Sequence, residues 1–383
     1  DSLILVDWIY NRSRPDDNAA PDAIGSFKNI PVYEMSQAGT DLVHTGGNFM
    51  ADGFGTAFSS ELVDYENSAS GAFNLTVKTP AEVDQLMEDW MGIDTYVKMT
   101  VLPYDDIHHI DMHMKLLDES TLMVSEYPEG VADGPQINAN IDYVLSNYTT
   151  KWGTPFEIVR IPSPPQLGGG YPNTGGWYET YSNAVFVNEK ILLPTYYEQY
   201  DTTAIRIWEE AMPGYEIIGI DCDGSESIIA SSGAIHCITH SVSVEDPLII
   251  SHLPLPDTEN TTVPYSVEAY LSHRSGIIQA NLFYSDNPNG PWTEVSMSDT
   301  GDGENWIAEI PAAEEDSDVF YYITGIAESG KTGAATVMIK GLAIGMQSVV
   351  IPVLMICLII YVANLFVGLY GVGIAAIGML ATV

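Results

Sequence analysis

Positive charge is scarce in this 383-residue chain, which has 13 lysines and arginines against 52 aspartates and glutamates and a formal net charge of −39. So few basic residues cannot assemble a basic surface, and nucleic acid is therefore not an expected partner. We interpret the acid excess as an adaptation to high salt, since dense negative charge keeps a folded protein soluble. Attraction of a cationic substrate into the negative field is the alternative.

Cysteine is rare as well, and its three positions are Cys222, Cys237 and Cys357. They provide no disulfide framework, and they do not decide between a reducing and an oxidising compartment. No secretory signal peptide is visible, and the chain opens on Leu3-Ile-Leu-Val6, which is typical of a core strand already under way. We therefore expect the chain to be a fragment or a processed product.

Charge disappears altogether after Lys340, and no histidine follows it either. The stretch Ile344–Val367 is long enough to span a bilayer, and Gly368–Val383 is typical of a second span. We expect residues 341–383 to be a transmembrane helical segment. A buried soluble helix is the alternative.

Strand and helix patterns alternate over residues 1–245, which predicts an α/β fold. Thr79-Pro-Ala-Glu82 has the pattern of a capping box with Pro at the first helical position, and Val83, Leu86, Met87, Trp90 and Met91 then fall on one helical face. Two further helices are expected, one with Asp201 as its N-cap and one over Gln136–Asn147. The strand-like runs are Tyr96–Leu102, Thr121–Ser125, Phe156–Ile161, Ala184–Val187 and Tyr215–Ile220.

The segment Pro162–Gly176 is too rich in proline and glycine for a helix or a strand. We expect it to be a long ordered loop or a lid. A plain connector is the alternative.

Beyond Asp246 the pattern changes to short strands separated by turn signals such as Thr300-Gly-Asp-Gly303. This spacing predicts a β-sandwich of immunoglobulin or fibronectin type over residues 246–340, with a role in interaction or stabilisation. The expected strands are Tyr265–Leu271, Gln279–Tyr284, Trp292–Met297, Trp306–Ile310, Val319–Ala327 and Thr336–Ile339.

Cys237 lies between His236 and His240, and a Ser231-Ser-Gly233 turn precedes it. A thiol is a useful nucleophile only as the thiolate, and a nearby imidazole can accept its proton. A buried structural cysteine is the alternative, because that is the commoner fate of a lone cysteine.

Three histidines and three aspartates lie within Asp105–His113. If this segment is a strand, His109 and Asp111 point to the same face, and an imidazole beside a carboxylate suits acid–base work on a cationic group. The spacing is not that of a His-x-x-x-His zinc site and no cysteine pair is near, which argues against a metal. A histidine-rich loop of no special use is the alternative.

The stretch Gly46–Thr56 is glycine-rich but lacks the lysine of a phosphate-binding loop. We interpret it as a strand–turn unit in which the backbone must approach a neighbour closely. Its glycines alone do not identify that neighbour.

Four motifs now follow one another along the chain: Gly46-Gly-Asn48 with Asp52-Gly53, His109-x-Asp111, Tyr181-Ser-Asn183 with Asn188, and Ile235-His-Cys237-Ile-Thr239. In order and spacing the set resembles the guanidine-modifying enzymes, and most closely the Porphyromonas-type peptidylarginine deiminase and agmatine deiminase family. The resemblance of the motifs covers residues 1–245. The predicted sandwich that follows also agrees with the domain layout of the bacterial peptidylarginine deiminases. The resemblance implies a pseudo-fivefold α/β propeller and a secreted or cell-envelope location.

The resemblance also implies a mechanism. Cys237 would attack the guanidinium carbon, His109 would act as general acid–base while ammonia leaves, and water would cleave the thiouronium adduct. Asp111 would grip the guanidinium nitrogens through charge-assisted hydrogen bonds, and Asn183 would help to hold the substrate. No metal or organic cofactor is implied.

Arg12 and Arg14 bear on the substrate. They resemble an arginine pair that, in the peptidylarginine branch, clamps a peptide's C-terminal carboxylate by bidentate contacts. Agmatine has no carboxylate, so the expected substrate is a peptide or protein with a C-terminal arginine, with agmatine as the alternative. Alternatively, Arg12 and Arg14 are simply solvated surface residues with no role in binding.

One family feature is missing. The family carries a second guanidinium-binding aspartate in an upstream Arg-Asp-x-Gly-Pro segment, and this chain has no such segment. We therefore expect the chain as it stands to be inactive or unstable. A membrane-anchored binding protein with a dead catalytic fold is a further alternative.

Residues 341–383 resemble transmembrane segments of ion-pumping membrane pyrophosphatases. None of the Asp and Lys clusters that bind pyrophosphate and magnesium is present there, so no pumping activity is implied. A pyrophosphatase fragment is thus an alternative supported by the tail alone. We favour a chimeric junction near Lys340 over a genuine fusion that anchors the deiminase in a membrane.

Overall fold

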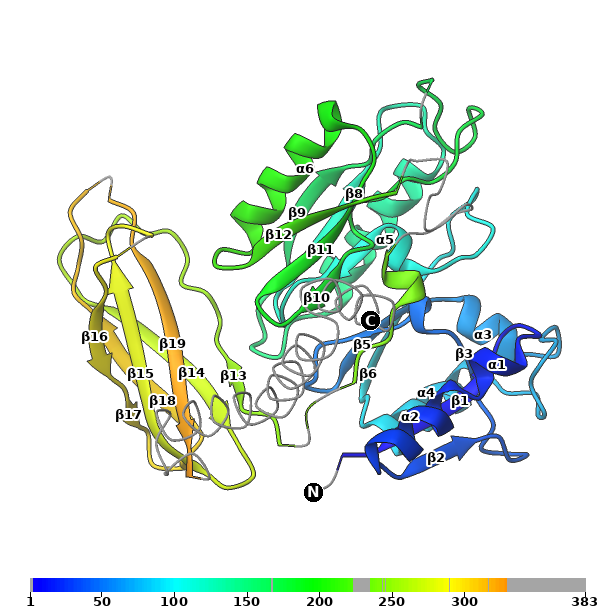
Figure 1. The fold of residues 1–383 in the computed structure, drawn as a ribbon, viewed down its shortest axis with the longest axis horizontal. Coiled ribbons are helices and arrows are strands. Elements are labelled where there is room, and N and C mark those ends of the chain that lie inside the picture. The colour runs from blue at the N-terminus through cyan, green and yellow to red at the C-terminus, as the bar shows by residue number, and fades with distance from the viewer. Residues whose placement is uncertain are drawn as a thin grey trace, which may run out of the picture. The chain divides into compact units, whose positions relative to one another are not determined.

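The computed structural model describes residues 3–328 except 167, 223–234, 243, 245, 289 and 316. The chain divides into two compact units, residues 1–245 and 246–383 (Figure 1). The predicted tail over 341–383 with Cys357, the Ser231–Gly233 turn and the strand over Thr336–Ile339 lie outside the described residues. Within the described residues, no helix combines the length and the apolar character that crossing a membrane requires.

The first unit repeats one arrangement of three strands. An antiparallel pair is followed by a helical crossover and by a strand parallel to the second one. The repeats are β4 (Met50–Ala51), β5 (Thr56–Ser60) and β6 (Thr95–Met99); β7 (Met114–Leu116), β8 (Thr121–Glu126) and β9 (Glu157–Pro162); and β10 (Val185–Val187), β11 (Lys190–Thr195) and β12 (Glu216–Asp221). A further sheet pairs β1 (Leu5–Tyr10) in parallel with β2 (Val32–Met35) and β3 (Val43–His44). The predicted α/β fold is confirmed, and the fivefold propeller stays a prediction.

Helices make the crossovers between parallel strands. They are α1 (Pro15–Asn18) and α2 (Ala20–Lys28) before β2, α3 (Leu62–Asn67) and α4 (Pro80–Met91) before β6, α5 (Asp133–Asn147) before β9, and α6 (Glu198–Ala211) before β12. The predicted capping box of α4 is present, because Thr79 accepts from the Glu82 amide while the Glu82 carboxylate accepts from the Thr79 amide at 2.7 Å.

The predicted N-cap of α6 is wrong. The helix begins at Glu198, and Asp201 lies inside its first turn. There the Asp201 carboxylate accepts from the Tyr196 amide at 2.9 Å and from the Tyr181 hydroxyl at 2.7 Å. From within the helix, the Asp201 carboxylate thus binds the segment that precedes it. Local sequence does not distinguish this role from that of an N-cap.

Apolar side chains pack between each sheet and its helices. On α4, Val83, Leu86 and Met87 are buried as predicted, whereas Trp90 and Met91 are partly buried and pack against the same cluster. Burying one such side chain contributes about 1.5–3 kcal/mol, so these clusters hold the strands firmly. The segments that enter and leave the strands are thereby placed, and they carry the polar residues of interest.

The second unit consists of two antiparallel sheets. One has the order β13–β14–β18–β17 and the other the order β16–β15–β19. The strands are β13 (Ile249–Ser251), β14 (Tyr265–Ser272), β15 (Ile277–Ser285), β16 (Thr293–Ser296), β17 (Ser298–Asp299), β18 (Asn305–Ile310) and β19 (Phe320–Ala327). Leu271 and Trp306 from one sheet share a core with Leu282 from the other. The unit is therefore a β-sandwich, and its assignment to the immunoglobulin type stays a prediction.

Candidate active site

Three short 3₁₀ helices bring the sequence motifs together. They are η1 (Gly46–Asn48), η2 (Ile110–Met112) and η3 (Ile235–Ile238), and η1 contacts both of the others. The strand considered for the His109–Asp111 segment is wrong. His109 is an extended residue that precedes η2, and Asp111 lies within that helix.

Cys237 is exposed on η3, which excludes the interpretation as a buried structural cysteine. Its Sγ lies 3.4 Å from Nδ2 of Asn183 and 3.8 Å from Oδ2 of Asp111. A sulfur beside an amide N–H donor and open to solvent is placed to react with a molecule that enters from outside.

Asn183 links the other members of the site. Its side chain is fully buried just before β10, and its Nδ2 donates to the backbone oxygen of Asp111 at 3.3 Å. Its Oδ1 accepts from the backbone amide of His236 at 3.0 Å. One amide side chain therefore holds η2 and η3 in register.

Asp111 is a buried carboxylate with one unused oxygen. Oδ2 lies 2.8 Å from Nδ1 of His236, whereas Oδ1 is buried and has no hydrogen-bond partner among the residues that the structure describes. Leaving a buried carboxylate oxygen unpaired is unfavourable by about 1–3 kcal/mol or more. A cationic N–H group would supply the missing donor.

His109 is a buried imidazole that is neutral near pH 7. Burial lowers the pKa of His109 to about 4, and the nearby Arg12 acts in the same direction although Asp111 opposes both. Its Nε2 has no hydrogen-bond partner within the described part of the chain. A neutral imidazole with an uncommitted nitrogen can accept and return a proton.

Gly47 is the backbone position that approaches this pair. A Cβ at Gly47 would lie 2.6 Å from Nδ1 of His109 and 3.1 Å from Oδ2 of Asp111. At the neighbouring Gly46, a Cβ would meet nothing within 4 Å. The close backbone approach predicted for this glycine-rich stretch is thus made by Gly47 to the two polar side chains.

The structure separates the two predicted arginines. Arg12, which follows β1, acts electrostatically on His109 and on the half-buried Glu66. Arg14 is 57% exposed, and its Nη1 lies 3.6 Å from Oδ2 of Asp17. Only Arg12 is therefore brought towards His109.

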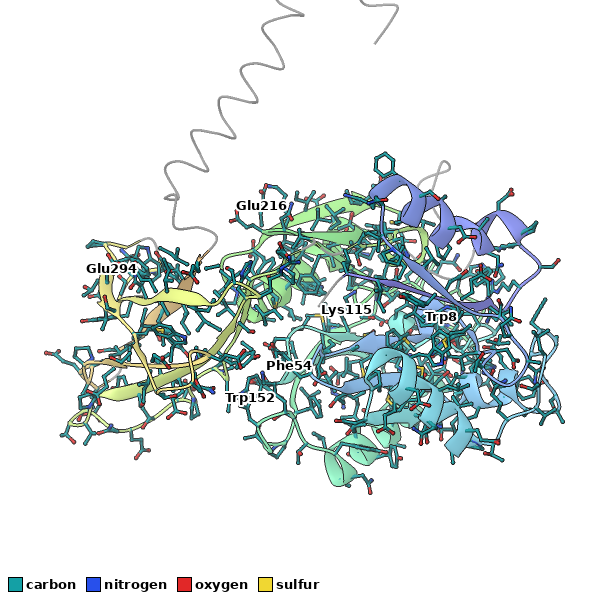
Figure 2. The ribbon with its side chains drawn as sticks, turned by 90° about the horizontal axis from the view of Figure 1, so that it is seen from below. Trp8, Phe54, Lys115, Trp152, Glu216 and Glu294 are labelled. Atoms are coloured by element: carbon teal, nitrogen blue, oxygen red, sulfur yellow. The ribbon has the colours of Figure 1, made fainter. Side chains whose placement is uncertain are left out.

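Two buried basic residues of the site escaped the sequence-based prediction. Lys115 on β7 is buried, and burial lowers its pKa to about 8 although Asp111 and Cys237 favour its charged form (Figure 2). His113 is buried against Asp111, and neither ring nitrogen has a partner among the described residues. A lysine between Met114 and Leu116 in an apolar strand of a lysine-poor chain was the available signal.

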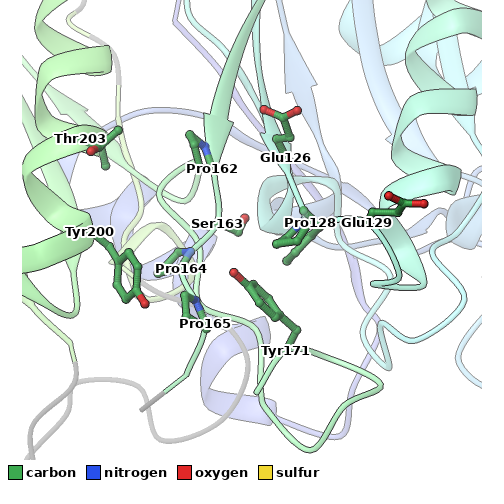
Figure 3. Close-up of a pocket in the computed structure, with 12 residues that line it drawn as sticks. Glu126, Pro128, Glu129, Pro162, Ser163, Pro164, Pro165, Tyr171, Tyr200 and Thr203 are labelled. Atoms are coloured by element: carbon green, nitrogen blue, oxygen red, sulfur yellow. The ribbon is translucent and has the colours of Figure 1, made fainter. Parts of the chain in front are cut away.

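A pocket of about 510 Å³ is formed elsewhere in the first unit. The predicted loop Pro162–Gly176 contributes Pro162, Ser163, Pro164, Pro165 and Tyr171, and α6 contributes Tyr200 (Figure 3). Cys237, His109 and Asp111 are not among its lining residues. The loop therefore shapes a cavity of its own.

An exposed thiol, a carboxylate with an unused oxygen and a neutral imidazole define a site for cysteine-dependent chemistry on a cationic group. The comparison with protein families agrees. The model of the Porphyromonas-type peptidyl-arginine deiminases matches residues 3–242. The chain belongs to that family.

Individual relatives lie in the same family. A Vibrio parahaemolyticus protein provisionally named an agmatine deiminase is 26% identical over 250 residues, which cover 61% of this chain and 66% of the relative. A Legionella pneumophila protein with the same provisional name is 24% identical over 243 residues, covering 62% and 66%. The chain thus spans just under two thirds of the length of these curated relatives.

Solved structures share the fold. A Porphyromonas gingivalis protein provisionally described as an arginine deiminase superposes with a TM-score of 0.51 at 21% identity, covering 62% of this chain and 70% of that one. A second family model, that of the inorganic H⁺ pyrophosphatases, matches residues 315–383. That match confirms the resemblance of the tail and extends it into the last described strand, β19.

Proposed function

We propose that the chain hydrolyses a guanidinium group, converting peptidyl-arginine to peptidyl-citrulline with release of ammonia. The observation that carries the proposal is the meeting of Cys237 with Asn183 and Asp111, at 3.4 Å and 3.8 Å from Sγ. Agmatine is the alternative substrate, with the same chemistry. A secreted or cell-envelope location is part of the proposal and is supported by the family resemblance alone.

Cys237 is the nucleophile and His109 the proton carrier. As the thiolate adds to the guanidinium carbon, the neutral His109 accepts a proton from one guanidinium nitrogen and returns it to the nitrogen that departs as ammonia. Water then gives a proton to the neutral His109, and the resulting hydroxide adds to the carbon of the adduct. The C–S bond breaks, which restores the thiolate and leaves a ureido group, and His109 releases its proton to the solvent.

Asp111 is the group that holds the substrate's charge. The unused Oδ1 accepts from a guanidinium N–H, and this charge-assisted hydrogen bond replaces a partner that the protein itself does not supply. His236 occupies the other oxygen and so keeps Oδ1 turned to the substrate. Asn183 holds the backbone of Asp111 and that of His236, the residue before Cys237.

The choice of substrate depends on Arg12. The Arg12 guanidinium acts electrostatically on His109, which supports recognition of a peptide's C-terminal carboxylate beside the site. The names of the curated relatives favour agmatine instead. The two substrates differ by the carboxylate and the peptide bond, so they can be compared directly.

The test is an assay of the full chain for ammonia together with the ureido product. Three substrates are compared: a peptide with a C-terminal arginine, the same peptide amidated at its C-terminus, and agmatine. Assays with and without high KCl cover the predicted salt adaptation. Product from the free peptide alone supports peptidyl-arginine and overturns the expectation that the missing upstream aspartate leaves the chain inactive. A preference for agmatine overturns the use of Arg12. No product from any of them agrees with that expectation and supports a binding protein with a dead catalytic fold.

The matched control is a pair of cysteine variants. Cys237→Ala abolishes product because the thiouronium adduct cannot form. Cys222→Ala retains activity because Cys222 is buried directly after β12, where its Sγ donates to the backbone oxygen of Ile220 at 3.3 Å. Product formation by Cys237→Ala would contradict the mechanism.

A further inference from the structure

Lys115 is an unusual feature of the first unit because it carries an ammonium group into an apolar cluster. Its side chain is 7% exposed. Its cross-strand partner on β8 is Met123, which belongs to the cluster that also includes Phe186 and Ile235. The Nζ atom of Lys115 lies 5.8 Å from the centre of the Phe186 ring.

A buried ammonium needs opposite charge nearby, since removing it from water is strongly unfavourable. The other buried lysine of this unit has a direct partner: Nζ of Lys78 lies 2.9 Å from Oδ1 of Asp41. Lys115 forms no ion pair with any carboxylate among the described residues. The groups that favour its charged form are Asp111 and Cys237.

Lys115 is close in the chain to Asp111, and the cluster around it extends to the helix of Cys237. β7 follows η2 directly, so Lys115 comes four positions after Asp111. Phe186, which contacts the ammonium, comes three positions after Asn183, whose Nδ2 is 3.4 Å from the Cys237 sulfur. Ile235 of the same cluster opens the helix that carries Cys237.

The charges around the thiol require a cation. Oδ2 of Asp111 lies 3.8 Å from Sγ, and a carboxylate at that distance opposes a thiolate. His236 on η3 lies within hydrogen-bonding distance of Asp111. His109 and His113, on which Asp111 also acts, are buried and neutral. Arg12 is a second fixed cation, and it acts on His109. A substrate guanidinium provides positive charge only after it has bound.

We propose that Lys115 is the fixed positive charge that holds Cys237 as a thiolate before the substrate arrives. The inference rests on the proposed function, because it assigns Lys115 to the nucleophile of that reaction. Lys115 acts through its charge and does not touch the substrate. It also balances Asp111, so that the empty site does not hold two uncompensated negative groups.

The test measures how alkylation of Cys237 by iodoacetamide depends on pH. The full chain is used, and mass spectrometry of the peptide that contains Cys237 separates it from the other cysteines. In Lys115→Met the midpoint moves to higher pH by about one unit or more, and alkylation below both midpoints becomes roughly tenfold slower. Lys115→Arg keeps the charge and a midpoint near that of the wild type.

The matched control is Lys28→Met, which removes an exposed lysine at the end of α2. It leaves the midpoint unchanged. Lys115→Gln serves as a second neutral variant should Lys115→Met fail to fold, and circular dichroism reports folding in each. An unchanged midpoint in a folded neutral variant overturns the proposal, because a purely structural lysine would alter stability and not the midpoint.

The alkylation readout needs no turnover, so the two proposals fail separately. A shifted midpoint in a chain that forms no ureido product retains the role of Lys115 and rejects the proposed function. Product formation with an unshifted midpoint retains the proposed function and rejects the role of Lys115.

Discussion

Nδ1 of His236 lies 2.8 Å from Oδ2 of Asp111, across a separation of 125 residues in the chain. His236 is the immediate neighbour of Cys237 on η3, and Asp111 is fully buried on η2. The hydrogen bond therefore ties the helix of the candidate nucleophile to the carboxylate proposed to hold the substrate.

His236→Ala should lower kcat/KM by roughly ten- to a hundredfold, because Asp111 and η3 lose their mutual alignment. His240→Ala is the matched control, since His240 is exposed, and it should keep the wild-type rate. Steady-state kinetics with kcat and KM determined separately make the measurement. Equal kinetics in the two variants would argue against a positioning role.

Gly47→Ala should lower kcat/KM by roughly a hundredfold or more, because its Cβ would push against both His109 and Asp111. Gly46→Ala adds the same methyl group one residue earlier, where a Cβ meets nothing within 4 Å. Comparing the two variants therefore tests the approach of the Gly47 backbone to His109 and Asp111, and not the loss of a glycine as such. Similar losses in both variants would show that the η1 turn itself, and not the approach to His109, is sensitive.

Arg12→Gln should raise KM for a peptide with a free C-terminal arginine by roughly tenfold and leave agmatine unaffected, because only the peptide has a carboxylate. Arg14→Gln should change neither, since Arg14 is exposed and paired with Asp17. Initial rates with the two substrates make the comparison. Equal effects of Arg12→Gln on peptide and agmatine would remove the carboxylate interpretation.

His113→Leu should make stability less sensitive to acid. Burial lowers the pKa of His113 from 6.5 to about 4, so between these pH values the unfolded chain binds a proton that the native state does not. The native state is thereby weakened as pH falls through this window. Relative to the wild type, the free energy of unfolding of the variant should rise by about 3 kcal/mol between pH 7 and pH 4.

Urea unfolding at both pH values measures this difference. The comparison with the wild type is needed because two carboxyl groups titrate in the same range: desolvation raises the pKa of the buried Asp105 to about 6 and that of the half-buried Glu66 to about 7. Those groups act in the opposite direction and cancel in the difference.

Patterns within a few residues were predictable because their causes are local. The capping box at Thr79 and Glu82 depends on four consecutive residues, and the apolar face of α4 depends on helical spacing. The α/β pattern and the strands of the sandwich follow from the same kind of periodicity. The importance of Cys237, His109, Asp111 and Asn183 came from their order along the chain, which is also a property of sequence.

Contacts between distant segments were decided by the tertiary structure. Arg12 and Arg14 look equivalent in sequence, but in the structure Arg12 acts electrostatically on His109, whereas Arg14 is exposed and pairs with Asp17. The strand considered for His109 and Asp111 is replaced by the start of the 3₁₀ helix η2, and Gly47 approaches the two side chains from η1.

By itself, the sequence determined the α/β fold, the sandwich and the identity of the nucleophile candidate, because local periodicity and motif order carry that information. Only the tertiary structure decided that His236 is the partner of Asp111, and that Lys115 is buried where Asp111 and Cys237 favour its charged form. The physical reason is burial. The pKa of His109 or Lys115, and the need of each for a partner, depend on how much water the packed sheets exclude, and no run of neighbouring residues contains that quantity.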